Sequence, residues 1–124
     1  MALTKQIGDL YAERVQKLLP LSEATYLILL ALTEPMHGYG IMQTVADFGN
    51  GSVKLGPGTL YGALNNLLSQ GLIVRAGESE SGQERRKLYA LTDLGRATVQ
   101  MECRRLSAMA EIGRAILERG KGKR

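Results

Sequence analysis

Apolar side chains recur at intervals of three and four residues along most of the chain, the spacing that places them on one face of a helix. In the first half of the chain this pattern predicts helices over residues 5–19, 23–32 and 38–48. Pro20 ends the first of them, and Ser22 is a suitable N-cap for the second. The second helix is apolar nearly all round, so we expect it in the core.

The helix predicted over residues 56–71 has a different exterior. Gly56 and Pro57 suit its start, Gly71 suits its end, and leucines form one stripe between them. The other face is uncharged and carries Gly58, Thr59, Gly62, Asn65, Asn66 and Ser69, with Tyr61 at the edge. An ordinary surface helix would carry Glu and Lys there, whereas a small, amide-bearing face fits the major groove of DNA.

The pattern then changes to that of strands. Residues 72–74 and 87–91 predict a hairpin around a polar tip, and residues 52–55 predict a short extended piece before the fourth helix. Thr92 is the expected cap of a long last helix that reaches about residue 118. The predicted order is three helices, a short strand, a helix, a hairpin and a helix.

This order predicts a mainly α, α+β fold, a winged helix-turn-helix with one helix added at each end. We expect an N-terminal amphipathic helix over 1–20, the winged helix-turn-helix over 21–92, a C-terminal dimerisation helix over 93–119 and a flexible basic tail over 120–124. Three helices and a hairpin also occur in other small α+β domains, so element order alone leaves those folds open.

Composition and charge narrow the classes of function. The chain has 124 residues, 44% of them hydrophobic, and a formal net charge of +4, which suits one domain with an anionic partner. Cys103 is the only cysteine, which favours a reducing, cytoplasmic location. No apolar run approaches the about 20 residues of a membrane-spanning helix, and no signal peptide is visible. We therefore expect no membrane partner.

Catalytic and metal sites are not indicated. Residues 51–59 approach a phosphate-binding P-loop, but Pro57 stands where that loop needs its lysine. His37 has no second ligand-type residue near it, which favours a capping or packing role. We expect no enzyme activity, no metal and no cofactor.

Three blocks of the sequence resemble the PadR family of bacterial transcriptional regulators. They are residues 35–41 (PMHGYGI), 55–61 (LGPGTLY) and 85–95 (RRKLYALTDLG), and with their spacing they cover about residues 24–100. The resemblance implies a dimeric winged-helix repressor with residues 56–71 as recognition helix, 77–86 as the tip of the wing and the last helix as dimer arm. It also implies a pseudo-palindromic operator in double-stranded DNA.

The chain departs from that family in two respects. Many relatives have basic residues where this chain has Asn65 and Asn66, and an asparagine side chain can instead bond N6 and N7 of adenine. The chain also has no Trp, so an aromatic-ligand pocket at the dimer centre, if shared, lacks the best stacking residue. The identity of a small-molecule effector therefore stays open.

DNA contacts are expected from hydroxyls, amides and glycines that choose the site and from cations that bind phosphate. The expected set is Tyr39, Lys54, Gly58, Thr59, Tyr61, Asn65, Asn66, Arg85, Arg86 and Lys87. Tyr39 has two alternative roles, a phosphate contact or packing within the domain. The ring of Tyr61 flanks the leucine stripe, so this residue also has a structural role.

The last helix carries an apolar stripe that needs a partner. Folding back onto its own domain is one solution, and a two-fold dimer in which it packs with the first helix is the one we favour. The expected dimer interface is Ile7, Leu10, Tyr11, Val15, Val99, Cys103, Leu106, Ala110, Gly113 and Leu117, with Cys103 as a buried packing residue.

We therefore predict a sequence-specific DNA-binding transcriptional regulator, a repressor released by a small ligand or another signal. The alternative is a winged-helix protein-interaction module without specific DNA binding. The sequence leaves open the operator, and whether Asn65 and Asn66 read bases or phosphates.

Overall fold

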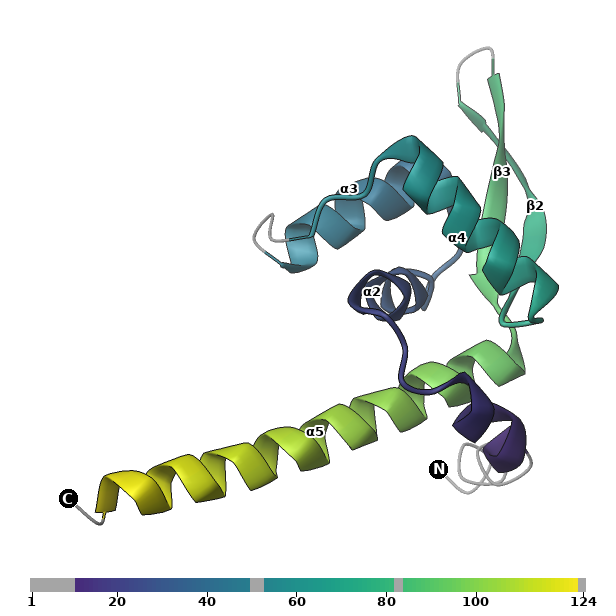
Figure 1. The fold of residues 1–124 in the computed structure, drawn as a ribbon. Helices are drawn as coiled ribbons and strands as arrows, with labels where there is room; N and C mark the ends of the chain where they lie inside the picture. Colours follow the sequence, from purple (N-terminus) through teal and green to yellow (C-terminus); the bar gives the residue numbers. More distant parts are fainter. Residues whose placement is uncertain (1–10, 50–52, 82–83, 123–124) are drawn as a thin grey trace.

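The computed structural model describes residues 11–49, 53–81 and 84–122 of the chain (Figure 1). Residues 11–18 are helical and are followed by α2 (Glu23–Ala31), β1 (Met36–His37), α3 (Gly38–Phe48), α4 (Pro57–Ser69), β2 (Ile73–Ser81), β3 (Glu84–Leu91) and α5 (Asp93–Gly122). This is the expected mainly α winged helix-turn-helix with an added helix at each end.

The core lies between α2, α3 and α4, with the start of α5 below them (Figure 1). It is made of aliphatic side chains, among them Ile28, Leu29, Ile41, Leu60 and Leu64, which are removed from solvent almost completely. These side chains recur at intervals of three and four residues, so they lie on one face of each helix, and that face packs in the core as the sequence pattern predicts.

Helix ends follow the capping signals in the sequence. The Ser22 side chain accepts a hydrogen bond from the Thr25 N–H at the start of α2. At the end of α4, Gly71 has a φ of +76°, and the Leu72 N–H donates to the Leu67 carbonyl at 3.0 Å. This is a Schellman motif, which closes the helix with the residue type that adopts positive φ most readily.

The sheet has the strand order β1-β3-β2, with all pairs antiparallel. The short extended piece expected at 52–55 is wrong as a strand, because the described residues 53–55 form no ladder. The third strand is instead β1, in which Met36 pairs with Tyr89 and His37 with Leu88. The segment between α2 and α3 therefore runs antiparallel to β3 and pairs with its backbone.

The wing is longer than the sequence pattern predicts, because most of the expected tip 77–86 belongs to β2 and β3. The register of this two-stranded ribbon places Glu78 opposite Lys87 and Glu80 opposite Arg85. Gly77, with a φ of +106°, lies at the irregularity in the ladder between Arg75 and Glu78. The side chains of residues 79–86 lie outside the described part.

Helix α5 has 30 residues and a length of about 45 Å at 1.5 Å per residue. Its first half packs below α2 and β3, and its second half projects from the domain as an arm (Figure 1). Residues 120–122 are helical, so the expected flexible tail is wrong for them, and residues 123–124 lie outside the described part.

A tight junction joins the end of α4 to the start of α5. Thr92 Oγ1 donates to the Gly71 carbonyl at 2.6 Å and accepts from the Gly95 N–H at 3.0 Å. The Thr92 N–H donates to the Leu72 carbonyl at 3.1 Å. A Cβ at Gly95 would collide with that carbonyl oxygen, so only glycine allows the approach.

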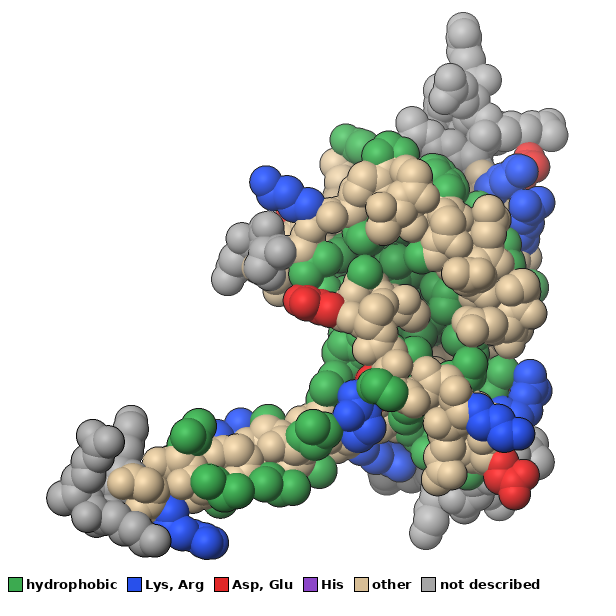
Figure 2. All heavy atoms as spheres, viewed as in Figure 1, with side chains coloured by type: hydrophobic (Ala, Val, Ile, Leu, Met, Phe, Trp, Pro, Cys, Tyr) green, Lys and Arg blue, Asp and Glu red, His purple; other side chains and the backbone are tan. Residues whose placement is uncertain are grey.

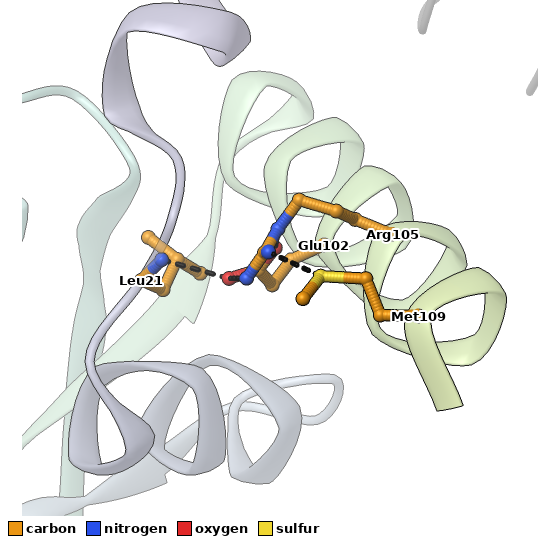
Figure 3. A network of polar contacts seen from close by, with 4 residues as sticks. All are labelled: Leu21, Glu102, Arg105 and Met109. Atoms are coloured by element: carbon orange, nitrogen blue, oxygen red, sulfur yellow. Dashed lines mark hydrogen bonds and ion pairs between the residues drawn. The ribbon is translucent and has the colours of Figure 1, made fainter. Parts of the chain in front are cut away.

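A buried carboxylate makes the second connection between α5 and the rest of the domain (Figure 3). Glu102 is 1% exposed, and its Oε2 accepts from the Leu21 N–H at 2.7 Å. Arg105 donates to both carboxylate oxygens, from Nε at 2.5 Å and from Nη2 at 3.0 Å. Hydrogen bonds from Arg105 outweigh burial and lower the pKa of Glu102.

Candidate nucleic-acid interface

Helix α4 buries one face and leaves the other open. Leu60, Leu64 and Leu67 are buried in the core, while the opposite face, with Thr59, Asn65 and Ser69, is exposed. No residue from Pro57 to Ser69 is charged. Figure 2 shows the α4 region in tan and green, with blue Lys and Arg side chains beside it on the hairpin. The exposed face of α4 therefore offers hydrogen-bonding side chains and no charged side chain.

Two glycines, in the first and second turns of α4, open this face. A Cβ built on Gly58 or Gly62 would meet no atom within 4 Å, so packing inside the chain does not require glycine at either position. Glycine inside a helix costs about 0.5–1 kcal/mol relative to alanine. The two positions are one helical turn apart, and together they let a partner outside the chain approach the backbone of α4.

Asn65 and Asn66 have different surroundings. Asn65 lies on the exposed face between Gly62 and Ser69, at the helical spacing that aligns these three residues. Asn66 lines a hollow of about 320 Å³ toward the start of α2, together with Ser22. The adjacent amides thus point to different sides of α4.

Tyr61 has a structural contact as well as an exposed surface. A Cβ on Gly38, the first residue of α3, would lie 2.5 Å from the Tyr61 hydroxyl oxygen and 2.9 Å from Cζ. The ring of Tyr61 therefore crosses the start of α3, and it still remains 45% exposed. Gly38 was absent from the predicted site, because nothing local in the sequence indicates a neighbour 23 residues later.

The start of α3 lies next to this contact. His37 Nδ1 accepts from the Gly40 N–H at 3.1 Å, so this histidine caps α3, one of the two roles favoured by the sequence. Tyr39 follows in the first turn and is exposed. Among the described residues, no group of three His, Cys, Asp or Glu side chains is placed to hold a metal ion.

The cations of the predicted site lie beside α4. Lys54 precedes the helix and is exposed, and Lys87 is exposed on β3. The backbones of Arg85 and Arg86 are in β3, opposite Glu80 and Ser79, and their side chains lie outside the described part. Arg75 on β2 is also exposed. Helix α4 thus carries the uncharged groups, and the cations lie on the segment before it and on the hairpin.

Comparison with known proteins extends over these elements. Residues 27–101 match the model of the transcriptional regulator PadR-like family, which is more than half of the chain. The chain belongs to the PadR-like family. A PadR family transcriptional regulator from Eggerthella lenta has a similar structure, with 26% identity, a TM-score of 0.63 and coverage of 95% of this chain and 97% of that one.

Bacillus subtilis PadR in complex with operator DNA matches in fold, with a TM-score of 0.56, 23% identity and coverage of 65% of this chain and 46% of that one. A curated relative is an uncharacterized 37.1 kDa protein in transposon TN4556 of Streptomyces fradiae. It is 39% identical over 82 residues, which are 65% of this chain and 22% of that protein. The chain thus spans about a fifth of that relative.

The PadR-like match includes the whole face described above and ends where the arm begins. Beyond it, the large exposed apolar side chains of the described residues are Leu106, Met109, Ile112, Ile116 and Leu117, of which Met109, Ile112 and Ile116 were not in the expected dimer interface. Leu117 is the most exposed of them at 71%. Leu106, Ala110, Gly113 and Leu117 follow one side of the helix.

The remaining residues of the predicted dimer interface differ in burial. Val15 and Val99 are 0% and 4% exposed inside this chain, so placing them at a dimer interface was wrong, because they already pack in the core. Ile7 and Leu10 lie outside the described residues, and Tyr11 is half-buried. The amphipathic pattern predicts which helix faces are buried. It does not distinguish burial in the core of one chain from burial against a second chain.

Cys103 is exposed on α5, contrary to the buried position expected for it. A hydrogen bond with the Cys103 thiol, followed by burial and nearby negative charge, raises the pKa of Tyr26 to about 12. The thiol therefore contacts α2 on one side and solvent on the other. The part of the chain that the structure describes contains no helix long and apolar enough to cross a membrane.

Proposed function

We propose that this PadR-like chain is a cytoplasmic, homodimeric, sequence-specific DNA-binding repressor. The observation that carries the proposal is the exterior of α4, which is exposed, uncharged and opened by Gly58 and Gly62. A DNA groove is a partner that needs both a close backbone approach and hydrogen-bonding side chains. The complex of Bacillus subtilis PadR with operator DNA supports this choice of partner.

In this proposal the two α4 helices of a dimer enter successive major grooves, about 34 Å apart, on a pseudo-palindromic operator. Tyr39 and Thr59 contact the backbone near the helix N-termini, where free amides favour an anion. Lys54, Lys87 and the arginines of β3 supply the phosphate contacts. The domain limits 21–92 for the DNA-binding part and 93–119 for the arm belong to the same proposal.

The arm provides the dimer contact. Its aliphatic side chains are exposed over the second half of α5, which is a large apolar surface for one chain to leave in solvent. Release from DNA follows a change in dimer geometry, produced by a small ligand or another signal. The Thr92 and Glu102 contacts are the connections through which a movement of the arm reaches the domain.

A second candidate is a protein-interaction module. Helices α3 and α4 together carry one charged residue, Asp47, and α3 ends in the exposed Phe48. Such weak charge also suits a protein partner, because non-specific DNA affinity depends on cations.

Fluorescence anisotropy with random and selected duplexes, repeated over a range of salt, separates the two candidates. DNA binding predicts tight binding of selected duplexes. It also predicts that the logarithm of the association constant falls linearly with the logarithm of the salt concentration, with a slope of about −0.9 for each phosphate contact. Equal binding of all duplexes with no salt dependence would contradict the proposal and favour the protein-interaction module.

A further inference from the structure

We infer that α4 reads A·T base pairs, with Asn65 as the side chain that recognises adenine. The inference rests on the proposed function and adds the class of base pair that this face accepts. It also separates Asn65 from Asn66, which the sequence alone leaves equivalent.

The first step is an inventory of the groups on α4. Guanine is read in the major groove chiefly by Arg or Lys at O6 and N7, and cytosine N4 by Asp or Glu. Helix α4 has none of these four residue types from Pro57 to Ser69. Adenine is read by the amide of Asn or Gln at N6 and N7, and α4 carries that group.

The second step is position. Asn65 lies on the exposed face between Gly62 and Ser69, where no side chain at position 62 stands between the amide and a base edge. Asn66 lies beside the hollow that it shares with Ser22 and Thr25 of the α2 start. Both amides are exposed, but Asn65 lies on the face opened by Gly62, whereas Asn66 lies on the side toward the start of α2.

The third step concerns thymine. Its C5 methyl group is the one apolar feature that the major groove displays, and apolar side-chain surface contacts it. The open space at Gly58 and Gly62 admits that methyl group to the backbone of α4. Both members of an A·T pair thus find a matching group.

The experiment is selection of bound duplexes from a random pool by the full chain, followed by titration of the selected operator. We expect A·T pairs at the centre of each half-site and an about 10-fold to 100-fold loss when one becomes G·C. Replacing adenine by 7-deazaadenine should weaken the wild type and leave Asn65→Ala unaffected at that position. Replacing thymine by deoxyuridine should weaken both.

Asn66→Ala is the matched control, and it should keep the wild-type preference and the 7-deazaadenine effect. Selected half-sites with G·C pairs under α4 would overturn the inference while leaving DNA binding intact. So would a uniform loss of Asn65→Ala affinity on all duplexes. A pool in which no duplex is enriched would instead contradict the proposed function itself.

Discussion

The outward faces of α4 and α5 are both uncovered in this chain, and they differ in chemistry. The α4 face has glycines, amides and hydroxyls, whereas the second half of α5 has long aliphatic side chains. A face of the first kind allows close approach and hydrogen bonding, and one of the second kind gains free energy by being removed from water. The difference supports the two partners that we propose, a nucleic-acid groove for α4 and a second copy of the chain for α5.

The two faces belong to helices that are joined by hydrogen bonds. Helix α4 ends at the Gly71 turn, and the cap of α5 is hydrogen-bonded to that turn through Thr92. In the proposed dimer, a change in how the two arms pack would therefore reach the spacing of the two α4 helices. Each of the following variants alters one face or the junction between them.

The largest effect is expected from a charge on the arm. Leu106→Asp should convert the dimer to monomers in sedimentation velocity, because the apolar stripe would have to bury a carboxylate. Operator affinity should fall about 100-fold or more as the second half-site is lost. Leu106 is 39% exposed in the single chain, so the fold should survive, which circular dichroism checks.

Ser107→Asp places the same charge on the polar side of the helix, in line with Arg104, Glu111 and Arg114, and is the control for Leu106→Asp. It should remain dimeric. If Leu106→Asp also sedimented as the wild-type dimer, the proposal that the apolar face of α5 binds a second copy of the chain would be wrong.

The junction should give the next largest effect. Gly95→Ala introduces a Cβ against the Leu72 carbonyl oxygen, which cannot move without breaking its bond from the Thr92 N–H. We expect a loss of about 2–3 kcal/mol in the free energy of unfolding, measured by urea denaturation. Unchanged stability would show that α4 and α5 are joined less tightly than the contact implies.

A smaller effect is expected at Glu102. Its folded-state pKa lies below the ordinary value of 4.5, so its stabilising contribution is complete above that pH and is lost as the pH falls toward the folded-state pKa. Glu102→Gln should cost about 1–2 kcal/mol at pH 7 and progressively less in acid. Denaturation series of both proteins that stayed parallel from pH 7 to pH 3 would argue against the buried ion pair.

The sequence predicted what local chemistry determines. Ser22, Pro57 and Thr92 gave the starts of three helices, because a cap acts within one turn of its own residue. The blocks around Tyr39, Thr59 and Lys87 resemble the PadR family, and the match of the family model over residues 27–101 confirms this resemblance.

Contacts between distant residues were not predictable in this way. The pairing of Met36 with Tyr89, the contact of Gly38 with Tyr61 and the approach of Gly95 to Leu72 each join residues more than 20 positions apart. Likewise, a helical apolar stripe shows that Val15 and Val99 are covered, but the covering surface depends on the whole fold.

The central claim, that the open face of α4 enters a DNA groove, is tested most directly at Gly62. Alanine there meets no atom of the chain, so Gly62→Ala should raise the free energy of unfolding by about 0.5–1 kcal/mol. The same Cβ should collide with DNA and lower operator affinity at least about fivefold. Gly120→Ala, also in open helical space, is the control and should leave DNA binding unchanged. Anisotropy titration of the selected operator, with thermal unfolding of the same samples, should show a more stable protein that binds more weakly. A more stable Gly62→Ala protein with wild-type operator affinity would contradict the account.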